Sequence, residues 1–302
     1  MSPYVLQVLS LFNVLAIAAL GLNVVVGYSG ILSVTQGALV GVGAYVGALV
    51  LLAGGGWLMA SALAIAVTAA LGCVVQLLSN RALGDYYIVI SLGIQTVLFA
   101  VMLNWQDVTR GSMGLSGIPG IPAFAGGRIE FWVVSFAVLI LAFLLVRAFS
   151  RSFHGTVLRA IRSDEIATLS LGKPVRLYKV GAFVFGAALS GVAGLLYATL
   201  HRYIDPYSFQ VNLSILLLSA VIVGGLGNVY GSLVGVGLIV ALPEALRFVP
   251  MPSGLAAHIN EIVYYSLLIL FVLFRRQGIV PEFGWGSSAL NVLGRPGAKV
   301  AP

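Results

Sequence analysis

Long apolar runs separated by short polar breaks dominate this chain. The first charged residue is Arg81, so eighty residues pass without Asp, Glu, Lys, Arg or His, several times the roughly 20 residues that one membrane crossing needs. The runs predict spanning helices at 4–26, 31–54, 57–80, 86–104, 131–149 and 180–200, the two arms of a hairpin within 213–247, and a last span that ends at Phe274. The predicted fold class is all-α, a polytopic transmembrane helix bundle of about eight or nine segments.

Two glycine-rich breaks interrupt the apolar runs, at Gly27–Gly30 and at 224–231, and indicate broken or re-entrant helices. Unwound backbone at membrane depth is tolerated only where it is buried or lines a cavity. The sequences at the breaks are similar, VVVGYSG and GALVGVG at the first, VIVGGLG and GSLVGVG at the second. This similarity suggests a parallel internal duplication, with chance matching of glycine-rich and valine-rich segments as the alternative.

The composition places the chain in a membrane and argues against catalysis. Hydrophobic residues make up 60% of the sequence and charged residues 8%, whereas about a quarter of residues are charged in soluble domains. The sequence holds no HExxH or GxSxG motif, no Cys/His cluster and no Walker A pattern. We therefore expect neither an enzyme nor a bound metal or cofactor, because chemistry within the membrane requires ionisable groups inside the spans.

A basic island at Arg147–Lys179 sets the expected orientation. It holds seven of the sixteen Lys and Arg against two acids, so the positive-inside rule places it in the cytoplasm. Counting crossings from the island puts 105–129 and 201–209 outside and the first glycine break on the inner side. The C-terminus is then cytoplasmic.

A short helix is predicted inside the island, at 164–171. Ser163 is the expected N-cap, and Asp164 and Glu165 follow in the first turn, where acids complement the helix dipole. Gly172 is expected to end the helix in the left-handed region. An ordinary amphipathic interfacial helix explains the pattern as well as a docking element does.

Polar groups beside the two breaks mark where a polar solute could pass. The candidate path residues are Gly27, Tyr28, Ser29, Gly30, Ser33, Thr35 and Gln36 at the first break, and Gly224, Gly225, Gly227 and Asn228 at the second. Each has a plain structural alternative, in which it only satisfies the broken backbone or its neighbours.

Five segments carry a family resemblance. They are LNVVVGYSGILSVTQGALVGVGAY (22–45), GSMGLSGIP (111–119), VLRAIRSDEIATLSLGKPVRLYKVGAFVFGAALSGVAGLLYA (157–198), VIVGGLGNVYGSLVG (221–235) and LLILFVLFRRQGIV (267–280). Together they resemble the LivM-type permease subunit of branched-chain amino-acid ABC importers (the LivH/LivM permease family), in order and over nearly all of 20–280. The third segment is the most specific. The last one departs from the family at Arg276, where such permeases usually have proline.

The resemblance implies a transport subunit rather than an enzyme. In that family the subunit pairs with a second, related permease, two cytoplasmic ATPases and a substrate-binding protein outside the membrane. The coupling segment of such permeases corresponds to 159–172, so the expected ATPase-docking residues are Arg159, Arg162, Asp164, Glu165, Ile166, Ala167 and Gly172. Near relatives of the family also carry urea, short amides and aromatic acids, so the resemblance does not fix the solute.

We therefore expect a multi-pass protein of the bacterial inner membrane. It should have a transmembrane permease domain at 1–280 with a cytoplasmic coupling loop at 150–179, and a flexible cytoplasmic tail at 281–302, where several Gly and Pro and no apolar period are found. The expected function is translocation of branched-chain or related hydrophobic amino acids by alternating access, driven by ATP hydrolysis in partner chains. The alternative is a passive channel for a small neutral solute such as urea or a short amide, which needs no ATPase.

Overall fold

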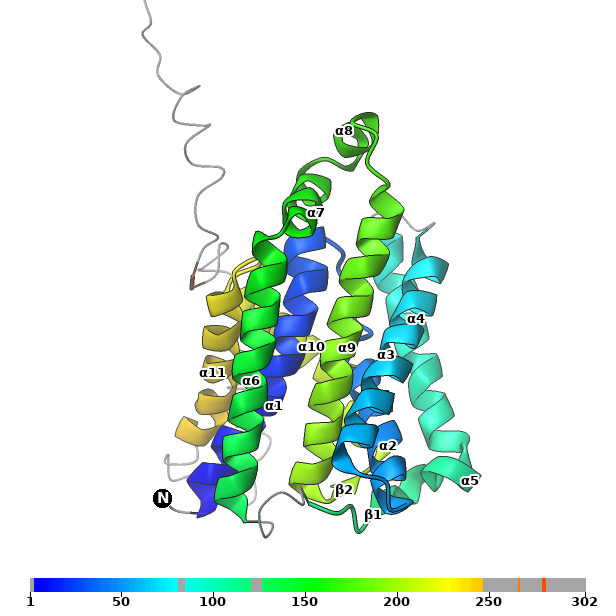
Figure 1. Cartoon of the computed structure of the whole chain (residues 1–302), viewed down its shortest axis with the longest axis vertical. Helices are drawn as coiled ribbons and strands as arrows, with labels where there is room; N and C mark the ends of the chain where they lie inside the picture. The colour runs from blue at the N-terminus through cyan, green and yellow to red at the C-terminus, as the bar shows by residue number, and fades with distance from the viewer. Residues whose placement is uncertain (1–2, 81–84, 121–126, 247–265, 267–278, 281–302) are drawn as a thin grey trace, which may run out of the picture.

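The computed structural model describes residues 3–80, 85–120, 127–246, 266 and 279–280. In this part of the chain, apolar helices form a bundle (Figure 1). Six are long and apolar enough to cross a membrane: α1 (Pro3–Asn23, continued by the π-helical turn η1, Val24–Tyr28), α3 (Trp57–Ser79), α4 (Asp85–Asn104), α6 (Arg128–Arg151), α9 (Val175–His201) and α10 (Val211–Gly224, with the preceding turn). Two shorter apolar helices are α2 (Gln36–Leu52) and α11 (Val229–Leu246).

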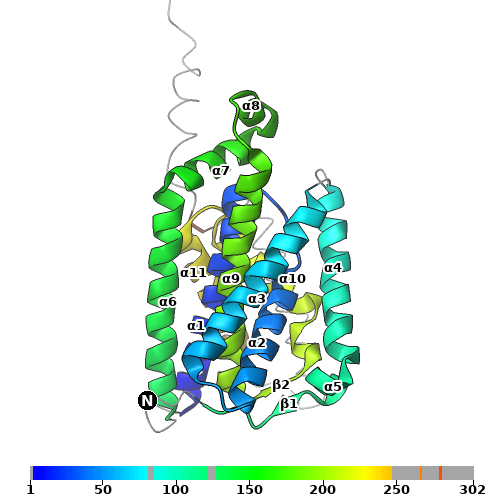
Figure 2. The same cartoon turned by 45° about the vertical axis from the view of Figure 1, so that its right-hand side comes forward.

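The all-α bundle predicted from the apolar runs is confirmed, and most spans begin and end close to their predicted limits. The predicted helix at 31–54 is an exception, because residues 30–35 have no regular secondary structure and α2 begins only at Gln36. This helix is 17 residues long and lies away from the end of the bundle where α1 finishes (Figure 2). The span predicted to end at Phe274 and the tail at 281–302 lie outside the described residues.

The bundle has two different ends. At one end, which we call the α8 end, α7 (Phe153–Ser163) and α8 (Glu165–Ser170) project beyond the other helices (Figure 1). The opposite end holds the N-terminus and the short elements α5 (Gln106–Thr109), η2 (Gly111–Met113), β1 (Leu115–Ser116), β2 (Tyr203–Ile204) and η3 (Pro206–Phe209). β1 and β2 pair antiparallel, with Leu115 opposite Ile204. The described parts of loops 105–129 and 201–209 therefore lie at one end of the bundle.

α9 is the central helix of the bundle. It packs along α1, α2 and α3, and its glycines let the backbones approach closely. A Cβ atom on Gly186 would lie 2.7 Å from the carbonyl oxygen of Gly21 in α1, and one on Gly194 would lie 2.1 Å from that of Val40 in α2. Small residues at such contacts are typical of membrane helix interfaces. The backbone of α9 is therefore in direct contact with the backbones of α1 and α2.

Large apolar side chains cover the outward faces of α3, α4 and α6. Leu58, Val89, Val97, Leu141 and Leu144 are among the exposed ones. A soluble monomer rarely exposes apolar surface on this scale. Exposed apolar faces of this kind are typical of a multi-pass membrane protein.

The hairpin predicted within 213–247 consists of α10 and α11, of which α10, with its preceding turn, is long and apolar enough to cross a membrane and α11 is shorter. α10 follows η3 at the N-terminal end and reaches the α8 end, and α11 returns. Near the end of α11, the Glu244 carboxylate accepts a hydrogen bond from the Tyr4 hydroxyl in the first turn of α1. The chain turns between the two arms at Gly225 and Gly227, whose φ angles of 126° and 76° suit glycine.

Candidate functional site

Two helices make up the projecting segment. α7 begins after Ser152, whose hydroxyl accepts a hydrogen bond from the Gly155 amide at 3.4 Å, and it buries Val157, Leu158 and Ile161 against the bundle. These three positions lie on one face of a helix. The sequence prediction places no helix here, although this apolar spacing is the signal for one.

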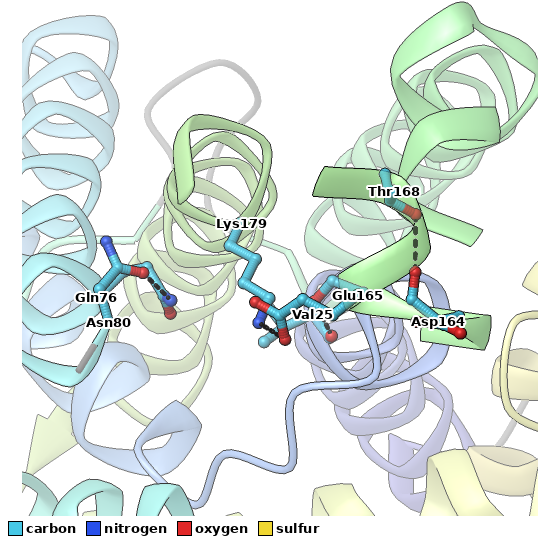
Figure 3. A network of polar contacts seen from close by, with 8 residues as sticks. Val25, Gln76, Asn80, Asp164, Glu165, Thr168 and Lys179 are labelled. Atoms are coloured by element: carbon cyan, nitrogen blue, oxygen red, sulfur yellow. Dashed lines mark hydrogen bonds and ion pairs between the residues drawn. The ribbon is translucent and has the colours of Figure 1, made fainter. Parts of the chain in front are cut away.

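Asp164 caps α8, so the prediction of Ser163 as the N-cap is wrong. The Asp164 carboxylate accepts a hydrogen bond from the Ala167 amide at 2.9 Å, and the Thr168 hydroxyl donates to the Asp164 carbonyl oxygen at 2.8 Å (Figure 3). Ser163 is the last residue of α7, and its hydroxyl donates to the carbonyl oxygen of Arg159. The physical reason is backbone geometry: an N-cap is extended, as Asp164 is with φ −155° and ψ 109°, whereas Ser163 is still helical.

An ion pair and a glycine turn hold α8 in place. The Glu165 carboxylate lies 2.8 Å from the Lys179 ammonium group near the start of α9, and both side chains are partly buried (Figure 3). α8 ends before Gly172, which adopts the predicted left-handed conformation with φ 73°. The segment is thus a positioned element rather than a loose loop.

The outer surface of α8 is apolar. Ile166, Leu169 and Leu171 are 76%, 51% and 77% exposed, and Ala167 beside them is also exposed. Exposed apolar clusters of this kind mark interaction sites for other proteins or for a membrane surface. Of the predicted docking residues, Ile166 and Ala167 belong to this outer surface, which we call the α8 surface (Ile166, Ala167, Leu169 and Leu171).

Arg159 and Arg162 point back toward the bundle instead. The Arg159 guanidinium donates to the Ser150 carbonyl oxygen at 2.5 Å and lies over the Tyr28 ring, 5.5 Å from its centre. The Arg162 guanidinium donates to the carbonyl oxygen of Gly27 at 2.5 Å. The predicted docking set therefore divides into an outer group on α8 and an inner group on α7 that contacts the first glycine break.

The predicted break at Gly27–Gly30 overlaps an irregular helical turn. The α-helix ends at Asn23, Val24–Tyr28 form a buried π-helical turn, and the Ser29 hydroxyl donates to the Val25 carbonyl oxygen at 2.5 Å. The helical conformation ends at Ser29, and Gly30 follows with a φ of 72°. Gly27 and Tyr28 are thus part of a widened helical turn, of the kind that often occurs at functional sites.

The two breaks meet each other through Asn23, a residue absent from the predicted site. The Asn23 side-chain oxygen accepts a hydrogen bond from the Gly227 amide at 2.9 Å, and its NH₂ group donates to the carbonyl oxygen of Asn228 at 2.9 Å. A Cβ atom on Gly27 would lie 2.4 Å from the Gly227 nitrogen. An asparagine within an apolar span is the sequence signal for such a buried contact.

Gly224 and Gly225 complete the second break by packing backbone on backbone. A Cβ atom on Gly224 would lie 2.0 Å from the carbonyl oxygen of Gly231 in α11, and one on Gly225 would lie 2.2 Å from that of Val280. The Val280 amide donates to the Gly224 carbonyl oxygen at 3.0 Å. These contacts favour a structural role for both glycines.

Ser33 and Gln36 lie apart from the contact between the two breaks, and their side chains form hydrogen bonds to other groups inside the bundle. The Ser33 hydroxyl lies 2.8 Å from that of Thr35. The Gln36 side-chain NH₂ group contacts the Ser190 hydroxyl of α9 and donates to the Gly186 carbonyl oxygen at 3.4 Å. The contacts of Ser33 and Gln36 therefore agree with the structural alternative, in which these residues only bond to backbone groups and neighbouring side chains.

Side chains of other helices cap the start of α2 inside the bundle. The Gly37 amide donates to the Ser214 hydroxyl at 2.7 Å, and the Ala38 amide donates to the side-chain oxygen of Gln95 at 2.8 Å. The Gln95 NH₂ group in turn donates to the Phe209 carbonyl oxygen at 2.9 Å. The first amides of a helix have no hydrogen-bond partners within that helix. The side chains of Ser214 and Gln95 act as their acceptors inside the bundle.

A cavity of about 850 Å³ opens at the α8 end beside the joined breaks. Its wall includes Tyr28, Gly227 and Asn228 of the predicted path together with Arg147, Ser150, Arg151, Thr156, Arg159, Ala160, Arg162, Ser163, Val229 and Tyr230. Four of these lining residues are arginines, so the cavity is basic. Among the described residues, no three His, Cys, Asp or Glu side chains come together in a way that could hold a metal ion.

Comparisons with known proteins place this architecture in a family. The model of the family described as branched-chain amino acid transport system / permease component matches residues 4–273. The chain is 30% identical over 295 residues to the high-affinity branched-chain amino acid transport system permease protein LivM of Salmonella typhimurium, covering 88% of this chain and 67% of that protein. It is 29% identical to LivM of Escherichia coli over 305 residues, with 91% and 69% covered.

The other permease type of these systems is also similar to this chain. LivH of Escherichia coli is 26% identical over 293 residues, with 88% of this chain and 90% of that protein covered. No solved structure matches the chain significantly. The match along nearly the whole chain and the bundle of apolar helices show that this protein belongs to the permease components of branched-chain amino acid transport systems.

Proposed function

We propose that this chain is a membrane-spanning subunit of an ABC importer that translocates branched-chain or related hydrophobic amino acids, and that partner ATPases drive it by docking on 159–172. The solute class is supported by the names of the LivM and LivH relatives, which are permeases for branched-chain amino acids. Similarity to both types supports pairing with a second permease. A substrate-binding protein on the outer side completes the proposed assembly.

The observation that carries ATPase docking is the α8 surface. A helix that projects beyond the bundle with three large apolar side chains exposed needs a partner. Its cap on Asp164 and its ion pair with Lys179 keep it rigid enough to transmit force. The basic residues at the α8 end support a location of this surface on the cytoplasmic side of a bacterial inner membrane, by the positive-inside rule.

Disruption of the α8 surface tests this proposal. The importer is purified with its co-expressed partners and reconstituted in proteoliposomes, and ATP-dependent uptake of labelled leucine is measured. In the double variant Ile166→Asp with Leu169→Asp, we expect the ATPases to be lost on purification and uptake to fall at least tenfold, on the order of a hot-spot loss. Ser170→Asp is the matched control, because it adds a charge to an exposed position of the same helix.

Two outcomes would overturn the proposal. The first is normal uptake and normal ATPase recovery in the double variant. The second is uptake of urea or a short amide by the chain alone, without ATP, which would favour the passive channel.

A further inference from the structure

We propose that Asn23 is a positioning residue of the transport cycle, which joins the two glycine breaks so that they move as one unit when Arg162 of the coupling segment moves. This inference rests on the proposed function, because it assigns a route for the force that ATPase docking applies. Figure 2 shows α7 above the end of α1, where this route begins.

The Asn23 side chain is fully buried and bonds to the second break in both directions. Its oxygen accepts from the Gly227 amide and its NH₂ group donates to the Asn228 carbonyl oxygen, both at 2.9 Å. One acceptor and one donor bond fix the orientation of the amide group. A buried pair of this kind resists separation, because either break moving alone leaves polar groups without partners.

Gly27 fixes the distance between the two breaks. A Cβ atom there would lie 1.9 Å from the Asn23 side-chain oxygen and 2.4 Å from the Gly227 nitrogen. The π-helical turn and the second break are therefore in direct contact. At this contact neither break can move toward the other, because there is no room for even one added carbon atom.

Arg162 connects this contact to the coupling segment. Its guanidinium donates to the Gly27 carbonyl oxygen at 2.5 Å, in the last turn of the helix. Carbonyl groups in the last turn lack amide partners within the helix, and a cation there is stabilised by the helix dipole. Movement of α7 thus acts directly on the backbone of the first break.

The neighbouring route through α9 is stiffer. α8 is also tied to α9 through Glu165 and Lys179, but α9 is held by backbone contacts at Gly186 and Gly194. By contrast, residues 30–35 have no regular secondary structure, and α7 contacts the first break directly through Arg162. The proposed route therefore assigns the movement to the joined breaks.

The test measures leucine uptake per ATP hydrolysed in the reconstituted importer. In Asn23→Ala we expect this ratio to fall roughly tenfold, a typical coupling between two sites, while the ATPases stay bound and basal ATP hydrolysis stays within about twofold. Asn13→Ala is the matched control. Asn13 is another buried asparagine of α1, but it donates to the Ser135 hydroxyl of α6 at 3.0 Å, so its loss should leave the ratio unchanged.

Arg162 variants test the same route from its outer end and do not depend on Asn23→Ala folding. Arg162→Met should lower the ratio by a similar factor, and Arg162→Lys, which can still donate to Gly27, should restore most of it. Because both residues act in series, the double variant Arg162→Met with Asn23→Ala should be no worse than the stronger single variant.

An unchanged ratio in Arg162→Met, an equal loss in Asn13→Ala and Asn23→Ala, or multiplying losses in the double variant would each overturn the inference. Failure of the proposed function has a separate signature. In that case the wild-type assembly itself shows no ATP-dependent uptake.

Discussion

The ammonium group of Lys179 lies 2.8 Å from the carboxylate of Glu165, so the first residue of α8 is tied to the start of α9. The 13 residues between them, 166–178, include the tip of the projecting segment. The ion pair therefore fixes the orientation of α8 relative to α9. A protein that docks on the α8 surface would contact it in that orientation.

Charge exchange tests this ion pair. Glu165→Lys places two cations together and should turn α8 away from α9, lowering uptake several-fold, and the double variant Glu165→Lys with Lys179→Glu should restore it. Thermal unfolding should change little, because a partly exposed pair contributes about 0–1 kcal/mol. Equal loss of uptake in the single and double variants would show that orientation of the tip does not depend on the pair.

The corrected N-cap predicts a difference between neighbouring residues. Asp164→Ala removes the acceptor for the Ala167 amide, which costs about 1 kcal/mol, so hydrogen exchange across α8 should be about fivefold faster. Ser163→Ala should change the rate less than about twofold, because Ser163 bonds within α7. Hydrogen exchange followed by mass spectrometry of peptides from 164–172 measures both. Faster exchange in Ser163→Ala alone would contradict the assignment.

Contact of the two breaks predicts that a single methyl group at position 27 is harmful. Gly27→Ala should destabilise the folded protein by about 1–3 kcal/mol through overpacking and should abolish most uptake. Gly56→Ala is the control, because its Cβ atom would meet nothing within 4 Å and its φ of −68° suits alanine. Thermal unfolding in detergent and uptake in proteoliposomes give the two readouts. Wild-type values for Gly27→Ala would mean that the breaks separate freely.

The cap on α2 predicts a large effect of one buried amide. Gln95→Leu removes partners of the Ala38 amide and the Phe209 carbonyl oxygen, and each buried group left without a partner costs about 1–3 kcal/mol. We expect a marked fall in unfolding temperature. Thr96→Val, on the same helix, should have little effect, because its exposed hydroxyl donates only to the Leu92 carbonyl oxygen of α4. Equal unfolding temperatures for the two variants would contradict a capping role.

The apolar runs predict the helices well because each membrane span must itself be long and apolar, and both properties can be read from a short stretch of sequence. Gly172 is predictable for the same reason, since a helix stop followed by Pro174 is a local signal. The predicted break at Gly27–Gly30 overlaps the interruption of the α-helix, but the sequence does not predict its form, a π-helical turn at Val24–Tyr28.

Hydrogen-bond partners on different helices cannot be read from a short stretch of sequence. Asn23 and Gln95 are visible as amides in apolar spans, which indicates that each is buried, but not which backbone groups they contact. Gly227 lies 204 residues from Asn23, and only the packed fold brings them together. The division of the predicted docking residues into Arg162, which faces inward, and Ile166, which faces outward, depends in the same way on how α7 packs.

The internal pairing of Gln36, Gln95 and Ser214 bears on the energised membrane in which such a protein works. A continuous water-filled path through the subunit would let ions cross the membrane. Each elementary charge that crosses a potential of 100 mV releases about 2.3 kcal/mol of free energy. Wetting this region first requires breaking buried hydrogen bonds, at about 1–3 kcal/mol for each group left without a partner. The same hydrogen bonds that hold the start of α2 in place therefore also raise the free-energy cost of an ion leak through this part of the subunit.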